Sequence, residues 1–146
     1  MVTPSPGAVV PVARSPIKRP AILIVEDEIF LANLLLLRFQ KENFEVVQAF
    51  SGTEALKKLD EIAPDLVLLD LILPNKNGFE VLEEISRNPQ WQSIPVVIVS
   101  NLGQESDIER GRQLGALDYY VKARLSIDEL VKKVKDIVDS GVDKAH

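Results

Sequence analysis

The alternation of short apolar runs with longer amphipathic stretches most constrains the fold of this chain. The apolar runs are rich in Val, Ile, Leu or Tyr and lie at residues 21–25, 45–49, 66–69, 95–99 and 118–121. Most are continuously apolar, which is typical of strands covered on both faces. Helical patterns lie between and after them, at residues 29–41, 53–63, 78–87, 105–114 and 127–139. The sequence therefore predicts an α/β fold in which a parallel sheet carries helices on both sides.

The two ends of the chain differ from this pattern. Residues 1–20 contain five of the nine prolines and no acidic residue, so we expect a disordered, proline-rich leader. We expect the folded domain at residues 21–140 and a C-terminal tail at residues 141–146. Prolines interrupt the apolar part of the leader, which argues against a signal peptide. There is also no run of 18 apolar residues, so a membrane span is not expected and a cytoplasmic location is predicted.

The composition excludes several kinds of chemistry. The chain has no cysteine and a single histidine, His146, which argues against disulfides, thiolate or histidine zinc sites and Ser-His-Asp hydrolysis. The net charge is −5 for the whole chain and −8 for residues 21–146, which argues against direct nucleic-acid binding. The remaining chemistry must come from carboxylates, lysine and hydroxyl groups.

Polar residues of these types follow the apolar runs. Ligands bind beyond the carboxyl ends of the strands of an open parallel sheet. Glu26 and Asp27 follow the first run, Asp70 the third, Ser100 the fourth and Lys122 the fifth. If the strands pair in the order 2-1-3-4-5, the three acids share one pocket flanked by Ser100 and Lys122.

Carboxylates that lie this close together need a counter-charge. Their hard oxygen atoms suit Mg²⁺, and a carboxylate beside a metal ion and a lysine is a good acceptor for a phosphoryl group. The pattern therefore indicates an aspartyl-phosphate site. We assign the next acid, Glu28, to the N-terminus of the helix at 29–41, where the helix macrodipole favours negative charge.

Four motifs in order carry a resemblance to a known family. They are V-E-D-E at 25–28, L-D-L-I-L-P-N-K-N-G at 69–78, V-S-N at 99–101 and D-Y-Y-V-K at 118–122. Together they resemble the receiver domain of two-component response regulators, of the chemotaxis-type single-domain kind, over about residues 20–140. The resemblance implies a flavodoxin-like, doubly wound sheet of five parallel strands in the order 2-1-3-4-5.

The resemblance also implies a role for each site residue. Asp70 would be the phosphoacceptor, with a histidine kinase or phosphotransfer protein as the donor. Mg²⁺ would be bound directly by Asp27, Asp70 and the backbone carbonyl of Ile72, and by Glu26 through a water molecule. The chain would not be an enzyme in the ordinary sense, but a phosphoacceptor that assists its own phosphorylation and dephosphorylation.

Three further residues complete the implied mechanism. Ser100 would hydrogen-bond a phosphoryl oxygen, Lys122 would pair with the phosphate, and Tyr119 would be an aromatic switch that turns inward on phosphorylation. Output would pass to a downstream protein target, without direct contact with nucleic acid or membrane. The protein would be a monomer, or a phosphorylation-linked dimer through the face of the fourth helix, the fifth strand and the fifth helix.

Two features of the site region set this chain apart from the family pattern, and the first leaves an alternative open. Ala123 stands where receivers usually have proline, so the Lys122–Ala123 bond is expected to be trans and the reach of Lys122 is in question. This departure favours the alternative of a phosphorylation-independent interaction or scaffold module. Ile72 and Leu102 are apolar at the two positions that influence hydrolysis in the family, which predicts a long-lived phosphorylated state. Ile72 also argues against a haloacid-dehalogenase-type phosphatase, which needs an acid there.

Overall fold

The computed structural model describes residues 19–141. Of the expected leader only Arg19 and Pro20 fall in this range, and of the expected tail only Gly141, so the disorder predicted for both ends lies outside the described residues. Gly141 ends the last helix with φ of 68° and donates its amide N–H to the carbonyl of Val138. This left-handed conformation suits glycine, which has no Cβ.

Within residues 19–141, five strands form one parallel sheet. They are β1 (Ala21–Val25), β2 (Glu45–Ala49), β3 (Leu66–Leu69), β4 (Val96–Ser100) and β5 (Asp118–Val121). The spatial order is β2-β1-β3-β4-β5, with every neighbouring pair parallel. The predicted fold class and strand order are therefore confirmed.

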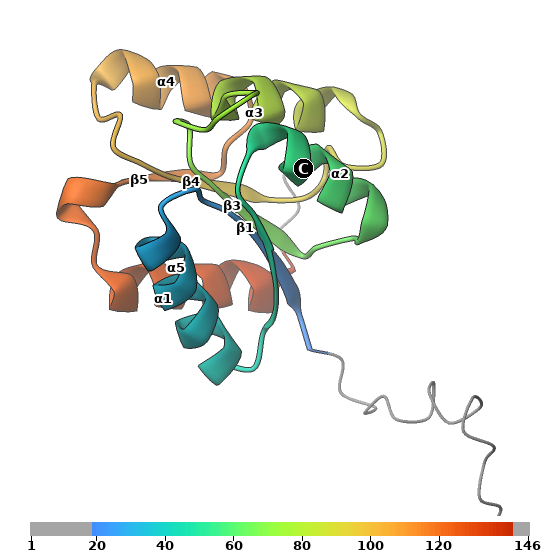
Figure 1. Cartoon of the computed structure of the whole chain (residues 1–146), viewed down its shortest axis with the longest axis vertical. Helices are drawn as coiled ribbons and strands as arrows, with labels where there is room; N and C mark the ends of the chain where they lie inside the picture. The colour runs from blue at the N-terminus through green and yellow to red at the C-terminus, as the bar shows by residue number, and fades with distance from the viewer. Residues whose placement is uncertain (1–18, 142–146) are drawn as a thin grey trace, which may run out of the picture.

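The described part of the chain has five α-helices, which cover the sheet in two layers on opposite sides of the strands (Figure 1). They are α1 (Ile29–Lys41), α2 (Gly52–Glu61), α3 (Gly78–Arg87), α4 (Glu105–Gln113) and α5 (Ile127–Ser140). Helices α2, α3 and α4 cover one face, and α1 and α5 cover the other. No helix among residues 19–141 combines the length and the apolar character that crossing a bilayer requires.

Two core clusters correspond to the two faces of the sheet. One contains Leu23, Leu69 and Ile98 from the strands together with the apolar sides of α2 and α3, and Trp91 packs against its edge. The other contains Ile22, Leu68 and Val97 with the apolar sides of α1 and α5. Because side chains alternate along each strand, a continuously apolar run supplies both clusters.

The boundaries of α2, β4, α4 and α5 differ from the predicted ones by one or two residues, and proline accounts for two of these differences. Helix α2 ends at Glu61 and the following Ile62 is extended. Pro64 lies three residues after the helix end and disfavours helical geometry in the preceding Ala63, so the helix could not continue through this segment. Strand β4 begins at Val96, since Pro95 has no N–H to donate to the sheet.

The register of the sheet aligns the ends of the two central strands. Val25 of β1 is paired with Leu69 of β3, so that Glu26 and Asp70 are each the first residue beyond the aligned pair. The amide of Asp70 donates to the carbonyl of Val25 at 3.0 Å, which fixes this alignment. The strand ends thus bring the two acids together although they are far apart in the sequence.

Candidate functional site: an acidic cluster with one lysine

Three acidic side chains meet at the carboxyl ends of β1 and β3. Each of Glu26, Asp27 and Asp70 offers one carboxylate oxygen, and these oxygens all lie within 4.8 Å of one another. Glu26 and Asp70 are almost fully buried, at 2% and 3% exposed, whereas Asp27 is exposed. The predicted meeting of the three acids is observed, and their mutual repulsion requires positive charge nearby.

Lys122 supplies positive charge from the other end of the chain. It begins a short 3-10 helix, η3 (Lys122–Arg124), directly after β5. Its Nζ lies 2.9 Å from Asp70 Oδ2 and 2.9 Å from Glu26 Oε1. No peptide bond in the described part of the chain is cis, so the Lys122–Ala123 bond is trans as expected. The lysine reaches the acids without a proline after it.

Burial and charge act in opposite directions on these groups. Burial, the largest effect, raises the pKa of Glu26 to about 7, while hydrogen bonds from the Glu28 amide and from Lys122 partly oppose it. Burial by itself would lower the pKa of Lys122, but hydrogen bonds to Glu28, Asp70 and Glu26 raise that pKa above its ordinary value. Lys122 is therefore held as a cation, and burial favours the protonated form of Glu26.

Glu28 also belongs to this site, which the sequence did not reveal. Its Oε2 accepts a hydrogen bond from Lys122 Nζ at 2.6 Å. Glu28 is the N-cap of α1, yet its side chain makes no capping hydrogen bond. The predicted role of a helix-terminal charge is therefore incomplete, because the carboxylate is turned toward the lysine. The signal available in the sequence was only that a third acid follows the apolar run.

The loop between β3 and α3 shapes the surroundings of Asp70. The Ile72 amide donates to Asp70 Oδ1 at 3.2 Å, while the Ile72 carbonyl accepts no hydrogen bond from the described residues. Gly78 begins α3 against the backbone of the acid: a Cβ at this glycine would lie 2.3 Å from the carbonyl oxygen of Asp70. The glycine is therefore required for α3 to pack this close to the strand end.

Ser100 and Tyr119 lie farther along the sheet. Ser100 ends β4 and is fully buried, and its Oγ accepts a hydrogen bond from the Leu102 amide at 3.3 Å. Tyr119, on β5, is half-buried against the cluster beneath α2 and α3, and its hydroxyl donates to the Leu102 carbonyl. Burial, together with the charges of Asp107 and Asp70, raises the pKa of Tyr119 to about 12. The phenol therefore stays protonated. No hydrogen bond joins Ser100 or Tyr119 to the three acids in the described residues.

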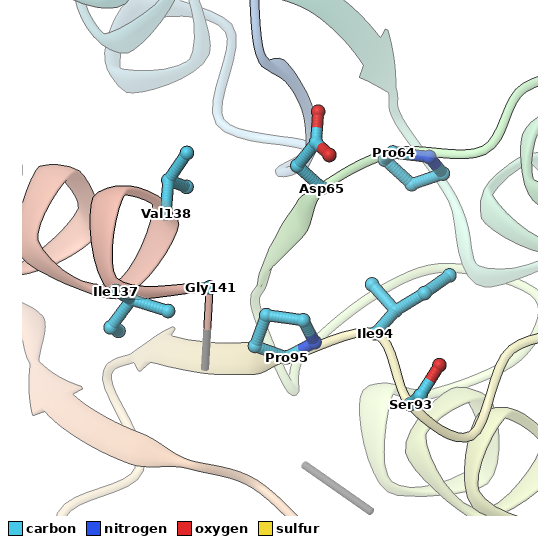
Figure 2. Close-up of a pocket in the computed structure, with 8 residues that line it drawn as sticks. All are labelled: Pro64, Asp65, Ser93, Ile94, Pro95, Ile137, Val138 and Gly141. Atoms are coloured by element: carbon cyan, nitrogen blue, oxygen red, sulfur yellow. The ribbon is translucent and has the colours of Figure 1, made fainter. Parts of the chain in front are cut away.

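A hollow elsewhere on the molecule does not belong to this site. It has a volume of about 250 Å³ and lies beside the starts of β3 and β4 and the end of α5 (Figure 2). Asp65 is the one ionisable residue among those lining it, and this carboxylate already accepts the amide N–H of Ala21 at 2.7 Å. The hollow thus lies at the amino ends of the strands, whereas the acids lie at the carboxyl ends. Among the described residues it brings no cluster of carboxylates and lysine together.

The comparisons with known proteins agree with the geometry. A family model described as "Response regulator receiver domain" matches residues 22–135. The chain is 39% identical over 116 residues to the phosphate regulon transcriptional regulatory protein PhoB of Rhizobium meliloti, a match that covers 80% of this chain and 51% of that protein. The chain thus spans about half the length of the curated relatives it matches.

Solved structures share the same architecture. A putative response regulator from Chloroflexus aurantiacus is 31% identical, with a TM-score of 0.78, over 84% of this chain and 99% of that one. The BeF3-activated N-terminal receiver domain of Klebsiella pneumoniae RstA is 28% identical, with a TM-score of 0.74, over 81% of this chain and 97% of that one. The match therefore covers almost the whole of both solved chains.

Proposed function

The chain belongs to the response regulator receiver domain family, and from this premise we propose that it accepts a phosphoryl group on Asp70. One observation carries the proposal. Asp70 is buried at the end of β3 with one oxygen 2.9 Å from the Lys122 ammonium, beside two further acids that belong to the same cluster. Clusters of buried carboxylates with a lysine are frequent at functional sites, which supports this role for Asp70.

The residues present fit a magnesium ion. Two carboxylates at neighbouring strand ends and a backbone carbonyl form a set of hard oxygen donors, which Mg²⁺ prefers. Asp27 and Asp70 would hold the ion directly, together with the Ile72 carbonyl, which accepts no hydrogen bond within the described residues. Glu26 would act through a water molecule. When bound, the ion would neutralise charge on the acids and on the incoming phosphoryl group.

The phosphoryl group would be transferred from the donor directly to the carboxylate of Asp70. A carboxylate oxygen of Asp70 attacks phosphorus, and the bond from phosphorus to the donor atom breaks with its electron pair remaining on the donor. The donor in the cell would be a phosphohistidine, since receiver domains pair with histidine kinases. Lys122 would then bind an oxygen of the transferred group, as its contact with Asp70 Oδ2 places it within reach.

Ser100 and Tyr119 would couple this event to the rest of the molecule. Phosphorylation would draw in the Ser100 hydroxyl and shift the population of Tyr119 conformers. In this structure the Tyr119 ring packs against the core and its hydroxyl donates a hydrogen bond to the Leu102 carbonyl. The switch therefore requires a second state in which this hydrogen bond is broken, and phosphorylation would act by disfavouring that state.

The surface around the acids suits a protein donor. Ile29, Phe30 and Ile72 are 57%, 85% and 51% exposed, and they directly follow the acid-bearing strand ends. Exposed apolar side chains beside a reactive group favour docking of a protein over capture of a small ion alone. The donor would be a histidine kinase or phosphotransfer protein, the setting would be the cytoplasm, and output would pass to a protein target from a monomer or a phosphorylation-linked dimer.

The proposal is tested by incubation with acetyl phosphate and Mg²⁺, followed by intact-protein mass spectrometry. We expect a mass gain of one phosphoryl group that disappears in Asp70→Asn and when EDTA replaces Mg²⁺. A chain that folds normally but gains no mass under these conditions, or that gains it equally in Asp70→Asn, would contradict the proposal. The first result would support the scaffold alternative.

A further inference from the structure

The side chain of Glu28 takes no part in starting α1. Ser, Thr, Asp and Asn are the residues whose side chains usually accept an amide N–H from the first turn of a helix, and Glu28 is not one of them. The Glu28 backbone does begin α1, since its carbonyl accepts the Ala32 amide at 2.9 Å, but its carboxylate caps nothing. Instead it reaches Lys122, 94 residues along the chain, at the shortest of the distances from that ammonium to any carboxylate.

The contacts of Lys122 show what this arrangement does. An ammonium group carries three protons. Lys122 Nζ lies within 3.0 Å of three different carboxylates, those of Glu26, Glu28 and Asp70, so each proton has an acceptor. In this state the lysine has no donor left for an oxygen of a phosphoryl group. One of the three contacts must be given up when such a group arrives.

The three carboxylates differ in how easily they can be released. The side chains of Glu26 and Asp70 are each 3% exposed and are held by further hydrogen bonds, from the amides of Glu28 and Ile72. The Glu28 side chain is 53% exposed and makes no other hydrogen bond among the described residues. It can rotate into water at little cost, whereas a buried carboxylate that loses its cation pays a large desolvation penalty.

We propose that Glu28 is a positioning residue that occupies one proton of the Lys122 ammonium and releases it when a phosphoryl group arrives on Asp70. This inference rests on the proposed function, because it assigns a regulator to the same site. Glu28 competes with the phosphoryl oxygens for one proton of the lysine. It therefore weakens binding of the phosphoryl group, and its removal strengthens that binding.

The test uses the whole chain and beryllofluoride, a stand-in for the phosphoryl group, titrated calorimetrically at saturating Mg²⁺. We expect Glu28→Gln to bind beryllofluoride about fivefold more tightly, the scale of one exposed ion pair released. Glu28→Asp keeps the charge but is one methylene shorter and cannot make the same contact. We expect it to bind about threefold more tightly than the unaltered chain, because the contact and not the charge alone holds the lysine. Glu105→Gln, at an exposed acid with no contact to Lys122, is the matched control and should bind unchanged.

Each outcome decides a different point. Glu28→Gln binding no more tightly than the unaltered chain would overturn the inference while leaving the proposed function intact. Tighter binding by Glu28→Gln with unaltered binding by Glu28→Asp would also overturn it. The negative charge at position 28 would then weaken binding by itself, without a contact to Lys122. Absence of Asp70-dependent binding in the unaltered chain would overturn the proposed function and this inference with it. A separate Mg²⁺ titration should show no tighter metal binding in Glu28→Gln, which has less negative charge.

Discussion

Replacing Lys122 by methionine isolates the electrostatic role of the lysine. Methionine keeps a long apolar side chain for the stem of the lysine but removes the ammonium. Three carboxylates then lose their shared cation, and the side chains of two of them, Glu26 and Asp70, are only 3% exposed. Removing one partner of a buried ion pair costs about 3–5 kcal/mol, because the remaining charge stays buried without compensation.

The loss should approach the lower value, about 3 kcal/mol, because the cluster has a way to relieve it. The pKa of Glu26 is already about 7, raised chiefly by burial, and loss of Lys122 raises it further. Near neutral pH this acid therefore takes up a proton and removes part of the repulsion. For a domain of this size, about 3 kcal/mol corresponds to a fall in melting temperature of roughly 10 °C.

The assay is urea unfolding followed by circular dichroism, at pH 8 and pH 6, in EDTA and then in Mg²⁺. The loss should be larger at pH 8, where Glu26 is charged. Mg²⁺ should restore more stability in Lys122→Met than in the unaltered chain, since a cation that binds only the folded state adds RT ln(1 + [L]/Kd), about 2.7 kcal/mol at one hundred times Kd.

The control is Lys133→Met. Lys133 pairs with Asp118 at 3.6 Å, and the two side chains are 45% and 34% exposed, so this variant should change stability by no more than about 0.5 kcal/mol. If Lys122→Met costs less than about 1 kcal/mol at pH 8, or if Mg²⁺ stabilises it no more than the unaltered chain, then Lys122 is not the counter-charge of the buried acids.

Glu26, Tyr119 and Ile72 can each be tested by a single substitution. The pKa of folded Glu26 is raised from 4.5 to about 7, so protonation of this acid stabilises the fold at low pH. That contribution to the free energy of unfolding is lost as the pH rises through about 7. In EDTA, Glu26→Gln should therefore flatten this part of the plot of unfolding free energy against pH. Tyr119→Phe removes the hydroxyl that binds the Leu102 carbonyl and should lower the free energy of unfolding by about 1 kcal/mol, measured in urea. The aspartyl phosphate should persist for minutes or longer, because Ile72 and Leu102 cannot orient water, and Ile72→Asn should shorten its lifetime in acetyl-phosphate labelling; decay within seconds in the unaltered chain would contradict this.

The sequence predicted the sheet well because its signal is local. Most strands are short, continuously apolar runs. Because helices cover both faces of the sheet, the side chains on both faces of a strand are buried, and the whole run is apolar. The errors lie at element boundaries such as the end of α2, which falls three residues before Pro64. A periodic pattern does not resolve such effects.

The site was predictable where it depends on strand ends and unpredictable where it depends on side-chain direction. Once the strand order is assumed, the meeting of Glu26 and Asp70 follows from their places beyond Val25 and Leu69. The side chain of Glu28 had two uses open to it, helix capping or contact with Lys122. The sequence cannot decide between them, because the energies of an exposed cap and an exposed ion pair are similar.

Ala123 raised the question of whether Lys122 reaches the acids at all, and the geometry answers it. β5 lies at the edge of the sheet, so the lysine must extend past β4 to meet Asp70 on β3 and Glu26 on β1. The pairing of Ser100 with Val121 makes Lys122 the first residue beyond that strand, and its flexible four-carbon stem covers the remaining distance with a trans bond behind it. The sheet register therefore positions the Lys122 ammonium beside the acids without a following proline. Ala123 is thus no longer an argument for a phosphorylation-independent scaffold module.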